Sequence, residues 1–311
     1  MKAVRAAEGG VQLVDLDEPP GTGEILQVRS ASICSSDLIY ISQGSRHILG
    51  HELAGVRADG SAYIVEALFG CMECEQCRNG QYNRCPTHGE RALGFSADGG
   101  MAEQFRVPTA RLVPLPAGLD VRDASVVEPA SVSWHGVRIS GAAPGARVAV
   151  VGAGALGLLA VAAARRQGIT DIAIEARYPH QIEAAERLGA SGPPKGEYDV
   201  IIEAAGSPAS LARAVELLAP GGTVVAIGVY MGTIEVDWLS VFLREGRLLS
   251  SLGYCRHGGG REMDDAAAML AEDPDIARTL ITHRFPLEEA EEAFRVASDR
   301  KSGAIRVVLE P

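Results

Sequence analysis

The spacing of apolar residues changes near residue 128. Before it, short runs that suit β-strands are separated by Gly and Pro, as in EILQVRS at 24–30, AYIVEALF at 62–69 and MAEQFRVP at 101–108. After it, buried-strand runs alternate with helical patterns, which is typical of a parallel sheet with helices on both faces. The pattern predicts a β-rich part followed by an α/β part.

Several elements can be placed individually. We expect strands at 147–151, 172–174, 198–206 and 221–229, an Ala- and Leu-rich helix at 155–167, and a loop at 192–197. Near the C-terminus the pattern predicts a helix over 290–298 and a strand over 305–309. No internal repeat is present.

Composition excludes several classes of function. A chain of 311 residues with 47% hydrophobic residues can fill two domains, and no apolar run reaches the roughly 18 residues of a membrane span. The net charge of −11 argues against nucleic acid as a partner. The start of the chain lacks a signal-peptide pattern, so we expect a cytoplasmic protein with reduced cysteines.

Four cysteines are closely spaced as CxxCxxCx7C: Cys71, Cys74, Cys77 and Cys85. Four thiolates with no open position form the closed, tetrahedral set of a structural zinc. Iron is the competing metal, because thiolate sets also bind iron. Cys255 has no partner in this scheme, and we interpret it as a buried thiol.

A second group of metal-type residues is scattered along the chain: Cys34, His51, Glu52 and Glu128. Together they could form an open, catalytic site, whereas each one alone has an ordinary explanation. Cys34 could pack as a small apolar residue, His51 could be a core or turn histidine, and Glu128 could be a carboxylate at a helix start.

A glycine loop follows the strand at 147–151. Gly152, Gly154 and Gly157 follow that strand and open the helix at 155–167, so backbone amides and the positive helix end can face a dinucleotide pyrophosphate. Helix packing alone could also explain such glycines, but the strand before and the helix after favour cofactor binding.

Eight blocks, in order, resemble the zinc-dependent medium-chain dehydrogenase/reductase family, especially its polyol branch with sorbitol dehydrogenase. The resemblance runs nearly end to end. The blocks are SICSSD at 32–37, LGHELAG at 49–55, the four-cysteine lobe, DGGMAEQFRVP at 98–108, VVEPASVSWHG at 126–136, VVGAGALG at 150–157, EAAGS at 203–207 and THRFPLEEAEEAF at 282–294.

The resemblance implies roles by position. Cys34 and His51 would bind the catalytic zinc with Glu128 as a further ligand, and Glu52 would lie beside the zinc and exchange with water as a ligand. Ser36 would pass the substrate proton outward, and Asp37 would hold the metal-bound imidazole. Further cofactor contacts would come from residues near the glycine loop and at later strand ends: Ala155, Leu156, Ala205, Gly228 and Val229.

Three departures from the family pattern affect function. Ile39, followed by Tyr40, stands where many members place a proton-relaying histidine, and the short segments before and after His51 imply trimmed loops. Ala176, not Glu175, falls at the ribose-binding position, and Arg177 follows it. A small residue followed by arginine leaves room for the extra phosphate of NADP. The alternative is that Arg177 is merely solvated and Glu175 binds the ribose of NAD.

Taken together, we expect an α/β fold: a Rossmann doubly wound parallel sheet domain plus a β-rich GroES-like catalytic domain carrying a structural zinc lobe. The catalytic domain would span 1–128 and 254–311, and the dinucleotide-binding domain 129–253. The expected function is a zinc-dependent alcohol dehydrogenase with two zinc ions per chain and NADP preferred over NAD. Its substrate would be a small secondary alcohol or ketone of polyol, sugar or cyclitol type, and the chain would form a homodimer or homotetramer.

Three other functions remain open. One is a tailoring dehydrogenase that acts on a less polar alcohol. Another is a thiolate-metal electron carrier, which would use only the four-cysteine lobe. The third is a catalytically silent dinucleotide sensor.

Overall fold

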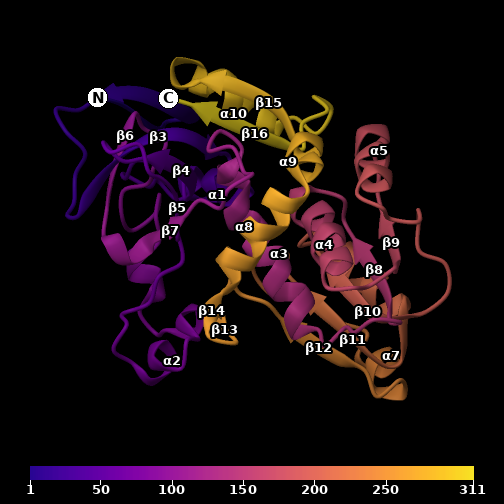
Figure 1. Ribbon diagram of the computed structural model, residues 1–311. Helices are drawn as coiled ribbons and strands as arrows, with labels where there is room; N and C mark the ends of the chain where they lie inside the picture. The colour runs from indigo at the N-terminus through magenta and orange to yellow at the C-terminus, as the bar shows by residue number, and fades with distance from the viewer. The chain divides into compact units, whose positions relative to one another are not determined.

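The computed structural model describes residues 1–311, and the chain divides into two compact units (Figure 1). The first unit contains residues 1–128 and 255–311, and the second contains 129–254. Both ends of the chain therefore belong to the first unit. None of the helices combines the length and apolar character that a membrane span requires.

The first unit is built on a seven-stranded sheet of order β15–β16–β3–β4–β5–β7, with β6 also paired to β3. β16 runs antiparallel to β3, so the last strand of the chain lies beside the strand that leads to Cys34. The strands of this unit are β1 (Lys2–Ala7), β2 (Gly10–Asp15), β3 (Glu24–Ser32), β4 (Glu52–Val56), β5 (Ala62–Val65), β6 (Gln104–Val107), β7 (Leu112–Pro114), β13 (Arg256–His257), β14 (Gly260–Arg261), β15 (Ile281–Pro286) and β16 (Arg306–Glu310).

Short helices connect these strands. The core of the unit is formed where α10 packs against the sheet, with Phe294 buried among Leu26, Val28 and Leu309 in one apolar cluster. The helices are α1 (Ser35–Ser42), α2 (Glu75–Arg78), α8 (Glu262–Glu272), α9 (Pro274–Leu280) and α10 (Ala290–Ser298), and α3 (Val127–Ile139) begins at the end of the first segment.

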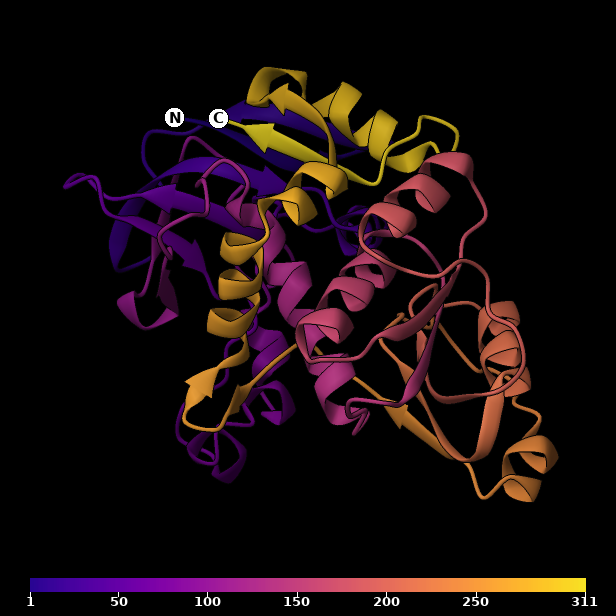
Figure 2. The same ribbon diagram turned by 45° about the vertical axis from the view of Figure 1, so that its right-hand side comes forward.

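The second unit is a five-stranded parallel sheet of order β12–β11–β10–β8–β9. Ala149 and Val151 of β8 pack with α6, whereas Val150 faces α4, so helices lie on both faces as predicted. α4 and α5 lie side by side (Figures 1 and 2). The elements are β8 (Arg147–Val151), α4 (Ala155–Arg166), β9 (Asp171–Glu175), α5 (Pro179–Arg187), β10 (Tyr198–Glu203), α6 (Pro208–Glu216), β11 (Leu218–Ala226), α7 (Trp238–Leu243) and β12 (Arg247–Ser250).

Five of the predicted elements are confirmed within a residue. The strand expected at 198–206 ends three residues earlier, at Glu203, and the one expected at 221–229 lies three residues earlier, at Leu218–Ala226. The strand at 147–151 and the helix at 290–298 have the predicted bounds, while the helix from 155 ends at Arg166 and the last strand starts at Arg306. The second unit ends at Tyr254, one residue beyond the expected 253.

Candidate functional site

Cys34 stands directly before α1 and is positioned from both sides. The backbone N–H of the preceding Ile33 donates to Val307 O at 3.0 Å, which ties the turn to β16. The Asp37 carboxylate accepts a hydrogen bond from Cys34 N at 2.9 Å and thereby caps the helix.

His51 lies immediately before β4 and faces the same turn. Its Nδ1 is 3.3 Å from Asp37 Oδ1, while Ser36 Oγ lies 3.2 Å from its Nε2 and donates to Cys34 Sγ at 3.1 Å. Burial opposes the charged imidazole and is the largest single influence, but the charges and hydrogen bonds of Asp37 and Cys34 together outweigh it and raise the pKa of His51 well above its usual value. Asp37 therefore both caps α1 and orients the imidazole.

Glu52 is fully buried in β4, opposite Ser32 of β3. The Ser32 hydroxyl donates to its carboxylate, and Arg306 Nη1 donates to both carboxylate oxygens at 3.1 and 3.0 Å. The same Nη1 donates to Ile33 O at 2.9 Å. Although burial acts against the charged guanidinium, the negative charges of Glu52, Cys34 and Glu128 raise the pKa of Arg306.

The structure brings Cys34, His51 and Glu52 together, with one ligand atom from each within 4.8 Å of the others. Glu128 is buried in the first turn of α3 but is not in this group. A thiolate, an imidazole and a carboxylate fit an open zinc site, and Asp37 at Nδ1 leaves Nε2 directed at the group. The residues present therefore suit a catalytic zinc.

The four-cysteine lobe places Cys71, Cys74, Cys77 and Cys85 within 4.8 Å of one another, and all four are free thiols. Met72 adopts a positive φ of 66°, which curls the loop so that the N–H groups of Glu73 and Cys74 point at Cys71 Sγ. These hydrogen bonds lower the pKa of Cys71. Four clustered cysteine sulfurs, of which those of Cys71 and Cys85 accept backbone N–H groups, suit a closed tetrahedral metal site.

The glycine loop has the close packing that a dinucleotide site requires. Gly152 has a φ of +105°, and a Cβ at Gly157 would lie 1.8 Å from Gly152 O. Gly154 caps α4, and Ala155, Leu156 and Gly157 form its first turn. Larger side chains at Gly152 and Gly157 would displace the backbone from the helix end.

Two further loops of the second unit are joined by Glu203. Its Oε1 accepts from Ala205 N at 2.8 Å and Gly206 N at 2.9 Å, and the Tyr230 hydroxyl donates to its other oxygen. This side chain couples the loop that contains Ala205 to the one that contains Gly228 and Val229. Sequence reasoning placed those three residues near the cofactor but missed the acid that joins them.

Side chains at the end of β9 determine the local charge. Glu175, the last residue of the strand, forms an ion pair with Arg213 of α6 at 2.8 Å. Ala176 is half-buried, and Arg177 is exposed. The positive charge of Arg177 is thus the exposed one at this strand end.

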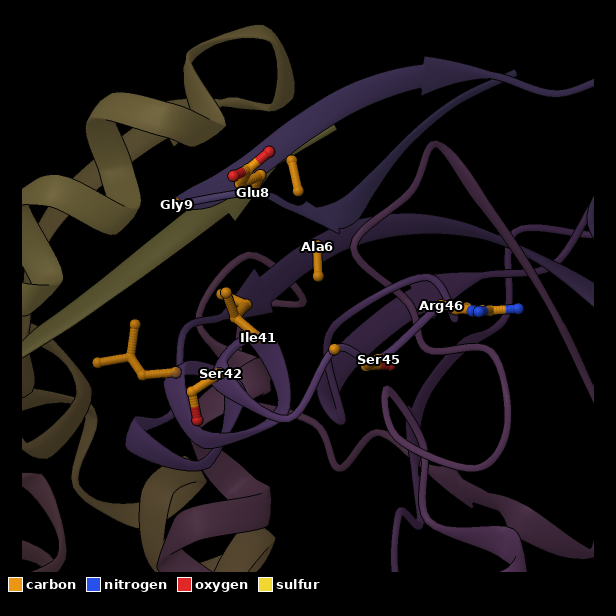
Figure 3. A pocket seen from close by; sticks show the side chains of 10 residues that line it. Ala6, Glu8, Gly9, Ile41, Ser42, Ser45 and Arg46 are labelled. Carbon is orange, nitrogen blue, oxygen red and sulfur yellow. The ribbon is translucent and has the colours of Figure 1, made fainter.

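A hollow of about 620 Å³ lies against α1 (Figure 3). It is lined by Leu38, Ile41 and Ser42 of the helix and by Glu8 and Gly9 of the β1–β2 turn. None of the metal-type or cofactor residues lines it. The hollow is therefore separate from the Cys34 group.

Comparison with known families covers nearly the whole chain. Residues 21–117 match the alcohol dehydrogenase GroES-like domain, and residues 117–310 match the glucose dehydrogenase C-terminus. The chain belongs to the zinc-type medium-chain alcohol dehydrogenase family. It is an oxidoreductase of the dehydrogenase type, with the GroES-like and Rossmann-type parts that were expected.

Individual members of this dehydrogenase family share less than 30% of their residues with this chain in the three comparisons that follow. L-galactonate-5-dehydrogenase of Escherichia coli is 27% identical over 88% of this chain and 88% of its own. D-xylulose reductase A of Aspergillus oryzae is 29% identical over 87% of this chain and 85% of its own. A protein from Sinorhizobium meliloti, assigned as a zinc-binding dehydrogenase and solved bound to NADP, is 28% identical with a TM-score of 0.86, covering 100% of this chain and 99% of that one.

Proposed function

We propose that this dehydrogenase is zinc-dependent and transfers hydride between a small secondary alcohol or ketone and a nicotinamide cofactor, with NADP preferred. The observation that carries the proposal is the meeting of Cys34, His51 and Glu52, with Asp37 on the second imidazole nitrogen. Such a set is typical of a zinc site that keeps a position open.

The roles of the chain's own residues follow from their contacts. When bound, zinc supplies Lewis-acid polarisation of the substrate oxygen, and the nicotinamide exchanges the hydride. Ser36 Oγ lies within hydrogen-bond distance of Cys34 Sγ and His51 Nε2, so its hydroxyl can take up or deliver the substrate proton beside the ligand group. Asp37 keeps the imidazole oriented, and Arg306 and Ser32 hold Glu52.

The four-cysteine lobe serves stability in this proposal. Its thiolates would bind the second zinc, and its free energy of binding would add to that of folding. Glu128 would act through charge on Arg306, or would approach the metal only after rearrangement, since it lies outside the ligand group.

The preference for NADP rests on the end of β9. Ala176 offers no carboxylate that would repel a 2′-phosphate, and the exposed Arg177 can donate two hydrogen bonds to one. Glu175, the alternative ribose ligand, is engaged by Arg213. The structural relative solved with NADP supports the same choice.

The substrate class rests on the relatives, whose names specify a sugar acid and a pentulose. We therefore propose a polyol, sugar, sugar acid or cyclitol. One observation favours a less polar alcohol as second candidate: the ring of Tyr40 lies 5.9 Å from that of His51 and 5.1 Å from that of Phe95, which gives the site an aromatic side.

Self-association is a further part of the proposal. Trp238, Leu239, Phe242 and Leu243 of α7 are each at least 63% exposed, and the neighbouring β12 is an edge strand. Exposed apolar side chains beside an open strand edge suit pairing with an identical surface on a second copy. We propose that this α7–β12 surface forms a homodimer.

The test is a substrate screen of purified protein. Polyols, sugars, sugar acids, cyclitols and simple secondary alcohols are offered with NADP and with NAD, and nicotinamide absorbance is followed. We expect NADP-linked turnover of a polyhydroxylated substrate that is lost in Cys34→Ala. Dinucleotide binding without turnover of any alcohol by the zinc-replete protein would instead support the silent sensor.

A further inference from the structure

The carboxylate at the end of β9 is held by a side chain from another part of the second unit. Arg213 Nε lies 2.8 Å from Glu175 Oε2, and Arg213 Nη1 lies 3.0 Å from Glu216. Hydrogen bonding to Glu175 is the main cause that raises the pKa of Arg213. Glu175 is thus paired with a partner 38 positions along the chain.

The backbone of Glu175 lies beside the glycine loop. Glu175 pairs with Val151 in the parallel register, and Gly152 N donates to Glu175 O at 3.3 Å. Because side chains alternate along a strand, Glu175 shares a face with Ala173, which packs in the cluster that contains Leu211 and Ala214 of α6. Arg213 holds the carboxylate on this α6 face, whereas Ala176 belongs to the opposite one.

We propose that Arg213 is a positioning residue for cofactor discrimination. It keeps the Glu175 carboxylate on the α6 face and offsets part of its negative charge, so that Arg177 is left as the exposed positive charge for an adenosine 2′-phosphate. This inference rests on the proposed use of NADP and adds a residue that does not itself touch the cofactor. Without Arg213, Glu175 would be an unpaired anion next to the glycine loop.

The size of the effect follows from exposure. The side chains of Arg213 and Glu175 are 36% and 43% exposed, so solvent screens their charges. A released carboxylate should repel a phosphate of charge about −1.5 to −2 only moderately, and we expect about a fivefold change in cofactor preference.

The experiment compares kcat/KM for NADP and NAD at a fixed alcohol concentration. Arg213→Gln should lower the NADP-to-NAD ratio about fivefold through a higher KM for NADP, with kcat retained, and the change should shrink in high salt. Arg213→Lys should keep the wild-type ratio. The matched control is Arg147→Gln, which removes the ion pair with Asp171 at the other end of β9 and should leave the ratio unchanged.

The double variant Glu175→Gln, Arg213→Gln identifies the route of the effect. If Arg213 acts by holding Glu175, the wild-type ratio should return in this variant. An unchanged ratio in folded Arg213→Gln, or a loss that the second substitution does not restore, would overturn the inference. Weaker binding of NAD in Glu175→Gln would also overturn the inference, because it would mean that Glu175 binds the ribose.

The wild-type protein tests the proposed function separately. Titration with each dinucleotide, followed by tryptophan fluorescence, should show tighter binding of NADP. If wild type binds neither dinucleotide, the proposed function fails before any variant is made. If wild type prefers NADP and the Arg213 variants do not differ from it, only the positioning role fails.

Discussion

Arg306 Nη1 donates hydrogen bonds to both carboxylate oxygens of Glu52, at 3.1 and 3.0 Å, and both side chains are buried. The pair joins β16, the last strand of the chain, to the β4 segment that begins beside His51. The C-terminal segment thus supplies the countercharge for a carboxylate of the candidate metal site. Arg306 and Ser32 together supply hydrogen-bond donors to the buried Glu52 carboxylate.

Arg306→Gln should leave Glu52 as a buried carboxylate without a countercharge. Removal of one partner of a buried ion pair typically costs about 3–5 kcal/mol, so the free energy of unfolding should fall by that order. Urea denaturation followed by far-UV circular dichroism measures it. The control is Arg122→Gln, which removes an exposed pair with Glu310 and should cost less than about 1 kcal/mol. Similar losses in the two variants would contradict the role given to Arg306.

Two zinc ions per chain are expected, and substitutions at the two sites should have different effects. Elemental analysis of wild type should give about two zinc per chain. Cys34→Ala or His51→Ala should remove one zinc and nearly all activity while the fold persists, whereas Cys74→Ala should mainly lower the melting temperature. Cys255→Ala, a buried cysteine outside both predicted sites, should keep both ions. Full activity in wild-type protein that contains one zinc or none would refute the assignment.

Ser36→Ala should lower kcat by roughly a hundredfold, the low end of what a positioned proton-transfer group contributes. Ile39 cannot relay a proton, and burial raises the pKa of Tyr40, so its phenol gives up a proton less readily. Zinc content should not change. Ser42→Ala is the matched control, since its hydroxyl is on the same helix but donates to Ile39 O and lines the separate hollow. If Ser36→Ala turns over at the wild-type rate, Ser36 does not carry the proton, and Tyr40 is the next candidate.

The sequence predicted much of the fold because its elements are locally determined. The strand at 147–151, the glycine loop and the helix that follows form one contiguous βα unit whose glycines are required by close backbone packing. The Cys34 and His51 segments were also recognisable, because Cys34 precedes a helix capped by Asp37 only three residues later. Local patterns of this kind can be recognised in a single sequence.

The residues that were missed act over long sequence separations. Arg306 is 254 positions from Glu52, and Arg213 is 38 from Glu175. The only signal for Arg306 was a charged residue at the start of an otherwise apolar strand, RVVLE. Glu128 was predicted as a ligand from its residue type. Its position in α3 leaves it outside the group of Cys34, His51 and Glu52, whose ligand atoms lie within 4.8 Å of one another. Distances between side chains of this kind cannot be derived from spacing alone.

The α7–β12 surface should determine the oligomeric state. Phe242→Glu together with Leu243→Glu places two charges among side chains that are 66% and 71% exposed in one copy. Charges at the centre of an apolar interface are costly to desolvate, so the variant should be a monomer by light scattering. Leu13→Glu, at an exposed apolar residue of the first unit, should leave the assembly unchanged. A monomeric wild type would contradict the proposed surface.

Arg177 and Ala176 should determine which cofactor is used. A charge-assisted contact to phosphate is worth about 1.5 to 3 kcal/mol, or roughly one to two powers of ten in preference. Arg177→Ala should therefore weaken NADP strongly and NAD little, because only NADP carries the 2′-phosphate. Ala176→Asp should shift preference towards NAD by offering a carboxylate to the free ribose hydroxyls and repelling the phosphate. Arg187→Ala, at the far end of α5, is the control for loss of a positive charge in the same region but away from the end of β9. The catalytic efficiencies with the two cofactors decide the outcome: an Arg177→Ala enzyme with the wild-type ratio would mean that the phosphate is bound elsewhere.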